Sequence, residues 1–171
     1  MSALKKKSDC DDKKNNDTKS LLLFCGQGVS TVFIGSELDA DVPIPPSARI
    51  AEVKVDTRGM DRPVIEIEFS SIVNLLTSSG TAVASLSFLL FRAKDNDEPV
   101  LVNSWPYEAF EMQSFFNPIR LSTSFVFNFC ERLNTSGCFK YFVEVSAGGL
   151  LDANLGINNV EIAALAGESC C

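Results

Sequence analysis

The sequence predicts an all-β protein: a single antiparallel β-sandwich of the jelly-roll type, with eight or nine strands and a flexible N-terminal arm. Several segments alternate apolar and polar residues with a period of two, which is typical of strands with one buried face. Turn-forming residues separate these segments at short intervals. No segment carries the apolar stripe and end caps of an amphipathic helix. Many strands in one chain of 171 residues favour a sandwich.

Four segments alternate most clearly, and they are AEVKVD (51–56), IEIEF (65–69), FVFNF (125–129) and FKYFVEV (139–145). In each of them, apolar residues that are mostly β-branched or aromatic occupy every second position. The segment SLSFLLF (85–91) is apolar on both faces, which predicts a strand central to the core or partly covered by another chain. Five further segments fit strands less clearly: Leu21–Cys25, Thr31–Ile34, Ala84–Arg92, Val100–Trp105 and Asn159–Leu165.

The chain divides into a connector arm (1–19), a jelly-roll domain (20–167) and a Cys-Cys tail (168–171). The arm contains six lysines, four aspartates and almost no apolar residues. Such a segment buries too little surface to offset the entropy of ordering it, so we expect it to be flexible. The arm is mildly basic, whereas the remainder of the chain is acidic.

Composition argues against several classes of function. The chain has no histidine, so a Ser–His–Asp or Cys–His catalytic system and a His-ligated metal site are excluded. We therefore expect no enzyme activity, no catalytic residues, no cofactor and no metal. A net charge of −7 argues against nucleic-acid binding, which needs a basic surface. No apolar run reaches the ~18 residues of a membrane-spanning helix, and the N-terminus lacks the apolar segment of a classical secretory signal.

Six cysteines need an explanation in a chain without a secretory signal. Cys130 and Cys138 lie near the facing ends of two predicted strands. If those strands form a hairpin, the two residues are candidates for an intra-domain disulfide, and the alternative is a pair of buried thiols.

The other four cysteines are candidates for inter-subunit disulfides, and they are Cys10, Cys25, Cys170 and Cys171. Cys10 lies in the predicted arm, and the last two end the chain. An extended arm of 19 residues spans up to ~60 Å, which exceeds the ~40 Å diameter of a body of this size. The arm is therefore long enough to reach a neighbouring subunit.

Three other patterns suggest chemistry only weakly. Asp95, Asp97 and Glu98 offer carboxylates for calcium but lack the spacing of a calcium loop, so a plain acidic turn is favoured. For Asp39 and Asp41, too, a plain acidic segment is favoured over a calcium site. The GQG segment (26–28) is too short for a phosphate-binding loop and predicts a bulge or bend.

Blocks of sequence along residues 20–166 resemble a family of short proteins from clostridia and related spore-forming anaerobes, catalogued as a domain of unknown function. The blocks are LLLFCG, IAEVKVDT, PVIEIEFSSIV, SLSFLLFRAKDNDEPVLVNSW, SFVFNFCE, CFKYFVEV and INNVEIAALA. In that family cysteines recur at the positions of Cys25, Cys130 and Cys138. The family has no assigned function.

The overall plan, a cysteine-bearing arm before a jelly-roll body, is similar to that of bacterial endospore appendage subunits. In those fibres the arm of one subunit enters the next and is locked by disulfides. The similarity implies an extracellular or spore-surface location without a classical signal peptide. This chain differs in that its paired cysteines stand at the C-terminus.

These observations lead to two main hypotheses. The first is a structural subunit that forms a head-to-tail homopolymer, a pilus-like filament at the spore surface, with a surface or spore-coat anchor as a further partner. The alternative is a soluble carbohydrate- or receptor-binding jelly-roll module. An enzyme with paired carboxylates ranks lowest, because no pair of acids stands apart from ordinary outward-facing strand positions.

Overall fold

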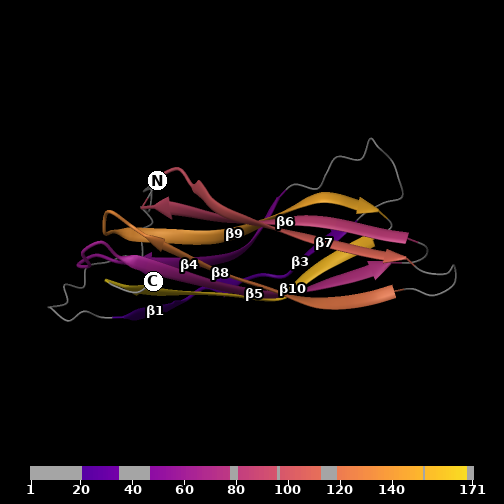
Figure 1. The fold of residues 1–171 in the computed structure, drawn as a ribbon, viewed down its shortest axis with the longest axis horizontal. Coiled ribbons are helices and arrows are strands. Elements are labelled where there is room, and N and C mark those ends of the chain that lie inside the picture. Colours follow the sequence, from indigo (N-terminus) through magenta and orange to yellow (C-terminus); the bar gives the residue numbers. More distant parts are fainter. Residues whose placement is uncertain are drawn as a thin grey trace, which may run out of the picture.

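The computed structural model describes residues 21–34, 47–77, 81–95, 97–112, 119–151 and 153–168, which form strands and turns without any helix (Figure 1). The described part of the chain thus contains no helix able to cross a membrane. Its ten strands are β1 (Leu22–Cys25), β2 (Gln27–Gly28), β3 (Thr31–Ile34), β4 (Ala48–Asp56), β5 (Val64–Thr77), β6 (Thr81–Lys94), β7 (Val100–Met112), β8 (Ile119–Arg132), β9 (Cys138–Leu151) and β10 (Ala153–Gly167).

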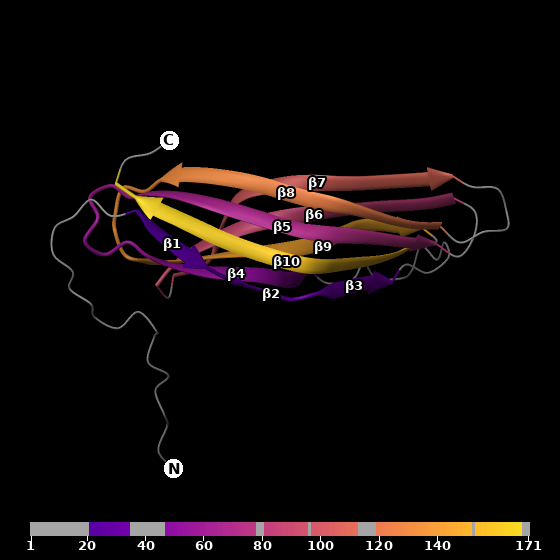
Figure 2. The ribbon, with the colours of Figure 1, turned by 90° about the horizontal axis from the view of Figure 1, so that it is seen from below.

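The strands form two five-stranded antiparallel sheets. Sheet A has the order β1-β10-β5-β8, and β3 also pairs with β10. Sheet B has the order β2-β4-β9-β6-β7. The strands run along the length of the molecule, and sheet A lies in front of sheet B in Figure 2. The expected all-β class and antiparallel pairing are therefore confirmed.

Strands β4 to β10 are longer than their sequence patterns suggested, whereas β1 and β3 lie where the sequence predicted short strands. The strand that brings the described total to ten is the two-residue β2, which lies in the GQG segment between them. The strand expected to end at Trp105 continues through Pro106 to Met112. Among the described residues β7 pairs only with β6, and an edge strand tolerates proline because one side of its backbone has no neighbour to bond.

The core lies between the two sheets and is rich in aromatic contacts. The Phe88 ring of sheet B lies 4.0 Å from the Phe125 ring and 5.9 Å from the Phe69 ring of sheet A, measured between centroids. At the edge formed by β7 and β8, Trp105 stacks on Phe127 at 3.8 Å. These contacts show that the two sheets pack face to face, as apolar faces of antiparallel sheets do.

The outer face of sheet B carries a second, smaller aromatic group. Phe91 of β6 stacks on Phe142 of β9 at 5.2 Å, and the guanidinium of Arg49 lies 3.5 Å from the centre of the Phe142 ring. This arrangement explains why the segment SLSFLLF (85–91) carries apolar residues on both of its faces. β6 lies between β9 and β7, with Phe88 in the core and Phe91 on the outer face, and Phe142 is buried although it faces outward.

Candidate assembly site

Cys25 is the last residue of β1 and lies opposite Ala163 of β10. Its side chain is exposed, and its thiol is free. The chain leaves sheet A directly after this residue and joins sheet B at Gln27. The cysteine therefore stands at an edge of the molecule, where the chain crosses between the sheets.

Two glycines make this crossing possible. A Cβ atom on Gly26 would lie 2.4 Å from Cγ2 of Ile162 and 2.5 Å from the carbonyl oxygen of Glu52. A Cβ atom on Gly28 would lie 2.1 Å from the carbonyl oxygen of Val160. Only glycine allows the backbone to pass so close to both sheets. The sequence predicted a bulge or bend in the GQG segment, and the structure instead places Gln27 and Gly28 in the short strand β2. The segment carries the chain from sheet A to sheet B directly after Cys25.

A groove of about 540 Å³ crosses the outer face of sheet A and begins at Cys25. Side chains from four strands line it, and they include Glu161 of β10, Glu68 of β5, and Val126 and Asn128 of β8. Val126 is 66% exposed. The groove therefore joins a free thiol, two carboxylates and an exposed apolar side chain.

A second groove, of about 590 Å³, follows β2 and β4 on the other side of Cys25. Arg49, Glu52 and Lys54 contribute charged side chains to its lining. Arg49 forms ion pairs with Glu144 at 3.3 Å and with Glu52 at 3.6 Å. Cys25 belongs to the linings of both grooves.

Cys130 and Cys138 are both in the disulfide state, which rules out the alternative of two free buried thiols. The hairpin that was the condition for a bridge between them does not form, because β8 pairs with β5 in sheet A whereas β9 pairs with β4 and β6 in sheet B. The turn before Cys138 is fixed by Thr57, whose Oγ1 donates to the Gly137 carbonyl at 3.0 Å and accepts from the Gly137 amide at 3.1 Å. The intra-domain bridge between Cys130 and Cys138 stays a prediction.

The described chain begins and ends at the same end of the molecule. Leu22 of β1 lies opposite Ala166 of β10, and the Glu168 carboxylate accepts a hydrogen bond from the Asp61 amide at 3.2 Å. Cys130 precedes the end of β8 at this same end, because Val64 pairs with both Arg132 and Gly167. Three predicted site residues, Cys10, Cys170 and Cys171, lie outside the described residues, as does nearly all of the predicted arm and tail.

The sequence did not single out a polar network that connects the two sheets near this end. The Glu131 carboxylate of β8 forms an ion pair with Arg92 of β6 and accepts a hydrogen bond from the Tyr141 hydroxyl of β9 at 2.7 Å. The sequence does contain a signal for this network. Glu131 continues the alternate positions occupied by Phe125, Phe127 and Phe129, so it belongs to the inward face of its strand. A carboxylate there needs partners from the opposite sheet.

Burial raises the pKa of Tyr141 well above its ordinary value of 10.0, and the neighbouring Glu131 charge raises it further. A group whose pKa is higher in the folded state favours folding fully below its unfolded pKa and loses that contribution as pH rises. We therefore expect the free energy of unfolding to fall above about pH 10, by up to ~1.4 kcal/mol per pH unit from this residue. Urea unfolding between pH 8 and 11.5 measures this slope. Tyr141→Phe should make it shallower, and an unchanged slope would contradict the assignment.

The acidic turn between β6 and β7 has no evident ligand role. The Asp97 amide donates to the Lys94 carbonyl at 2.8 Å, and the Asp95 amide donates to the Cys138 carbonyl at 2.9 Å. Within the described residues, no group of three or more Cys, Asp or Glu side chains is arranged to hold a metal ion. Asp39 and Asp41 lie outside those residues.

Comparison with known proteins identifies a family for this chain. No curated protein matches it significantly. Residues 19–167 match a family described as a domain of unknown function, DUF4489, and this match spans every strand of both sheets. The chain therefore belongs to the DUF4489 family.

Proposed function

We propose that this chain is a structural subunit that assembles head-to-tail with copies of itself into an extracellular or spore-surface filament. The observation that carries the proposal is the free, exposed Cys25 thiol, which stands between two grooves at the edge of the molecule. An intramolecular structural role does not require an exposed thiol, whereas a covalent link between subunits does.

We further infer that the two sheets form a jelly roll. The strand order supports this topology: between β3 and β6 the chain changes sheet at every step, and it does so again from β7 to β10. The last strand, β10, lies between β5 and the short first strands. Long connections that return a late strand beside an early one are typical of the double Greek key.

In the proposed filament, the arm of one subunit (residues 1–19) docks on the next and brings Cys10 to Cys25. The arm has lysines, and Glu68 and Glu161 line the groove that begins at Cys25. The link forms when the two thiols are oxidised by molecular oxygen outside the cell. Two thiols and one oxygen molecule give one disulfide and one hydrogen peroxide. Cys170 and Cys171 are the proposed links to a further neighbour.

Non-reducing gel electrophoresis and electron microscopy of protein purified without reductant test this function. We expect a ladder of covalent multimers and visible filaments. Cys25→Ser should shorten the ladder to the multimers joined through Cys170 and Cys171, and it should leave filaments that dissociate more readily in denaturant, because one covalent link is lost and the docking contacts remain. Deletion of residues 1–19 should abolish filaments.

The folded state of each variant is the control for this experiment. Both variants should keep the circular dichroism spectrum of a β protein, because Cys25 is exposed and residues 1–19 precede the predicted domain. Wild-type protein that migrates only as one chain and forms no filaments would refute the proposal. A discrete small oligomer instead of a filament would favour the binding-module alternative.

A further inference from the structure

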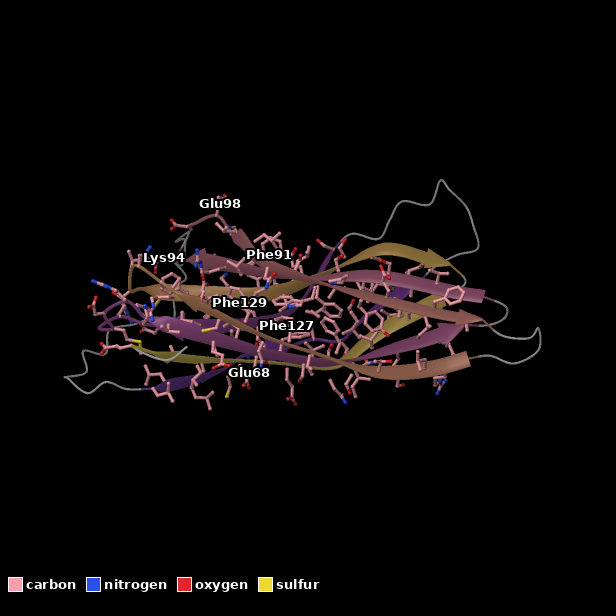
Figure 3. The ribbon with its side chains drawn as sticks, in the orientation of Figure 1. Glu68, Phe91, Lys94, Glu98, Phe127 and Phe129 are labelled. Atoms are coloured by element: carbon pink, nitrogen blue, oxygen red, sulfur yellow. The ribbon has the colours of Figure 1, made fainter. Side chains whose placement is uncertain are left out.

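Cys130 lies on the outer face of sheet A. Its neighbours along β8, Phe129 and Glu131, point between the two sheets. Cys130 therefore takes the alternate, outward position, opposite Glu66 of β5. In Figure 3, Phe129 lies toward the middle of the molecule, whereas Glu68, which shares the outer face with Glu66, lies at its lower margin. Cys130 is exposed, and its sulfur is in a disulfide, so its partner reaches the outside of sheet A.

Cys138 points to the other side of the molecule. It precedes the buried Phe139 of β9 and lies opposite Asp56 of β4, which puts it on the outer face of sheet B. Packed sheets are about 10 Å apart, and outward side chains on opposite sheets point away from each other. A disulfide requires its two Cα atoms to lie within about 7 Å. This geometry argues against the bond between Cys130 and Cys138 that the sequence predicted.

Three other cysteines are left as partners of Cys130. The chain contains six cysteines, and Cys25 is free. The remaining candidates are Cys10, Cys170 and Cys171, which lie outside the described residues. The strands β1 and β10 distinguish between them, because they fix where the two terminal segments leave the body.

The end of β10 lies close to Cys130. Gly167 is opposite Val64 of β5, which is in turn opposite Arg132 of β8. Two strand spacings, about 10 Å, separate Gly167 from Arg132, and Cys130 lies about 7 Å back along β8. Figure 2 shows the ends of β8 and β10 at the same end of the molecule. Three extended residues span up to about 10 Å, and a disulfide adds about 5.5 Å between Cα atoms, so both tail cysteines are within reach.

The first residue of the tail is already directed toward β8. The Glu168 carboxylate accepts a hydrogen bond from the amide of Asp61 at 3.2 Å, and Asp61 lies in the turn that leads into β5. In the strand order β1-β10-β5-β8, β5 is on the side of β10 that faces β8. The arm starts on the far side of β10, and eleven residues separate Cys10 from Leu22. Closing a longer loop costs more entropy, so the tail is favoured over the arm.

We propose that one cysteine of the tail, Cys170 or Cys171, forms a disulfide with Cys130 of its own subunit. The bond forms when molecular oxygen oxidises the two thiols: two thiols and one oxygen molecule give one disulfide and one hydrogen peroxide. The bridge fastens the tail across β5 to β8. Successive side chains of an extended chain point to opposite sides, so the second tail cysteine points away and stays available for the proposed link to a further neighbour. The bridge goes beyond the proposed function and does not depend on filament formation.

Peptide mapping without reductant tests this bridge. The full chain is reduced and then oxidised in air at high dilution, and the band that migrates as one chain on a non-reducing gel is digested. Trypsin cleaves after lysine and arginine, so it separates the cysteines into the peptides 8–13 (Cys10), 20–49 (Cys25), 121–132 (Cys130), 133–140 (Cys138) and 141–171 (Cys170 and Cys171). We expect most of peptide 121–132 to be linked to peptide 141–171. A link to 133–140 or to 8–13 in its place, or a gel with multimers and no single chain, would overturn the proposal.

Serine variants supply the matched control and a second test. Cys10→Ser alone should leave the link between peptides 121–132 and 141–171 unchanged. Adding Cys170→Ser and Cys171→Ser to this variant should lower the disulfide-bonded fraction of Cys130 at least tenfold. A Cys130 that stays bonded there would rule out the tail bridge. Because the mapping uses the single chain, its failure leaves the proposed link between Cys10 and Cys25 standing, and a wild type without filaments leaves the bridge standing.

Discussion

Phe88→Ala should lower the free energy of unfolding by about 3–5 kcal/mol, the range for removal of a large buried aromatic side chain. Phe88 is 0% exposed and contacts the rings of Phe125 and Phe69 across the two sheets. The cavity left by the substitution removes packing from both sheets at once. Urea unfolding measures the change, and the melting temperature should fall by roughly 10 °C.

Phe110→Ala is the matched control for this prediction. Phe110 lies on β7 and is 61% exposed, so its removal takes little apolar surface out of the core. We expect a change within about 0.5 kcal/mol. A loss for Phe88→Ala as small as the loss for Phe110→Ala would contradict the prediction that the contact between the sheets stabilises the molecule.

The alternation of residues along single strands predicted much of the fold. The inward positions expected in the segment 139–145 are buried, and Lys140 and Glu144 face outward. The same holds for Ile65, Ile67 and Phe69. Local pattern suffices here because a period of two assigns every side chain to one face of a strand.

Pairing between strands was beyond the reach of this reasoning. Periodicity specifies faces but not neighbours, so it left open whether the segments that carry Cys130 and Cys138 form a hairpin, and in the structure they belong to different sheets. Phe142 illustrates the same limit. It occupies an outward position, and its burial depends on Arg49 and Phe91, which pack over it from other strands.

The candidate site was predictable only in part. The sequence named Cys25 as a linking residue, and the structure shows it free and exposed. The grooves beside it depend on the close approach of Gly26 and Gly28 to β10 and β4, which no local pattern reveals.

Glu131→Leu should lower the free energy of unfolding by about 2–4 kcal/mol. The substitution leaves the Arg92 guanidinium and the buried Tyr141 hydroxyl without the carboxylate that both contact. An unpaired charge at a partly buried position and an unsatisfied buried hydroxyl are each destabilising. Glu131→Gln should lose less, about 1–2 kcal/mol, because the amide oxygen still accepts from Tyr141. Glu108→Leu, at an exposed position of β7, is the control and should stay within about 0.5 kcal/mol.

A double-mutant cycle with Tyr141→Phe separates the network from simple loss of packing. If Glu131 acts through the hydroxyl, the two substitutions together should cost at least about 1 kcal/mol less than the sum of their separate effects. Additive losses would mean that the residues stabilise the protein independently. The position of the network makes this result informative about how the two sheets are held together. Glu131 follows Cys130 directly and Tyr141 lies shortly after Cys138, so coupling between them would show that the sheets are fastened together where both disulfide cysteines lie.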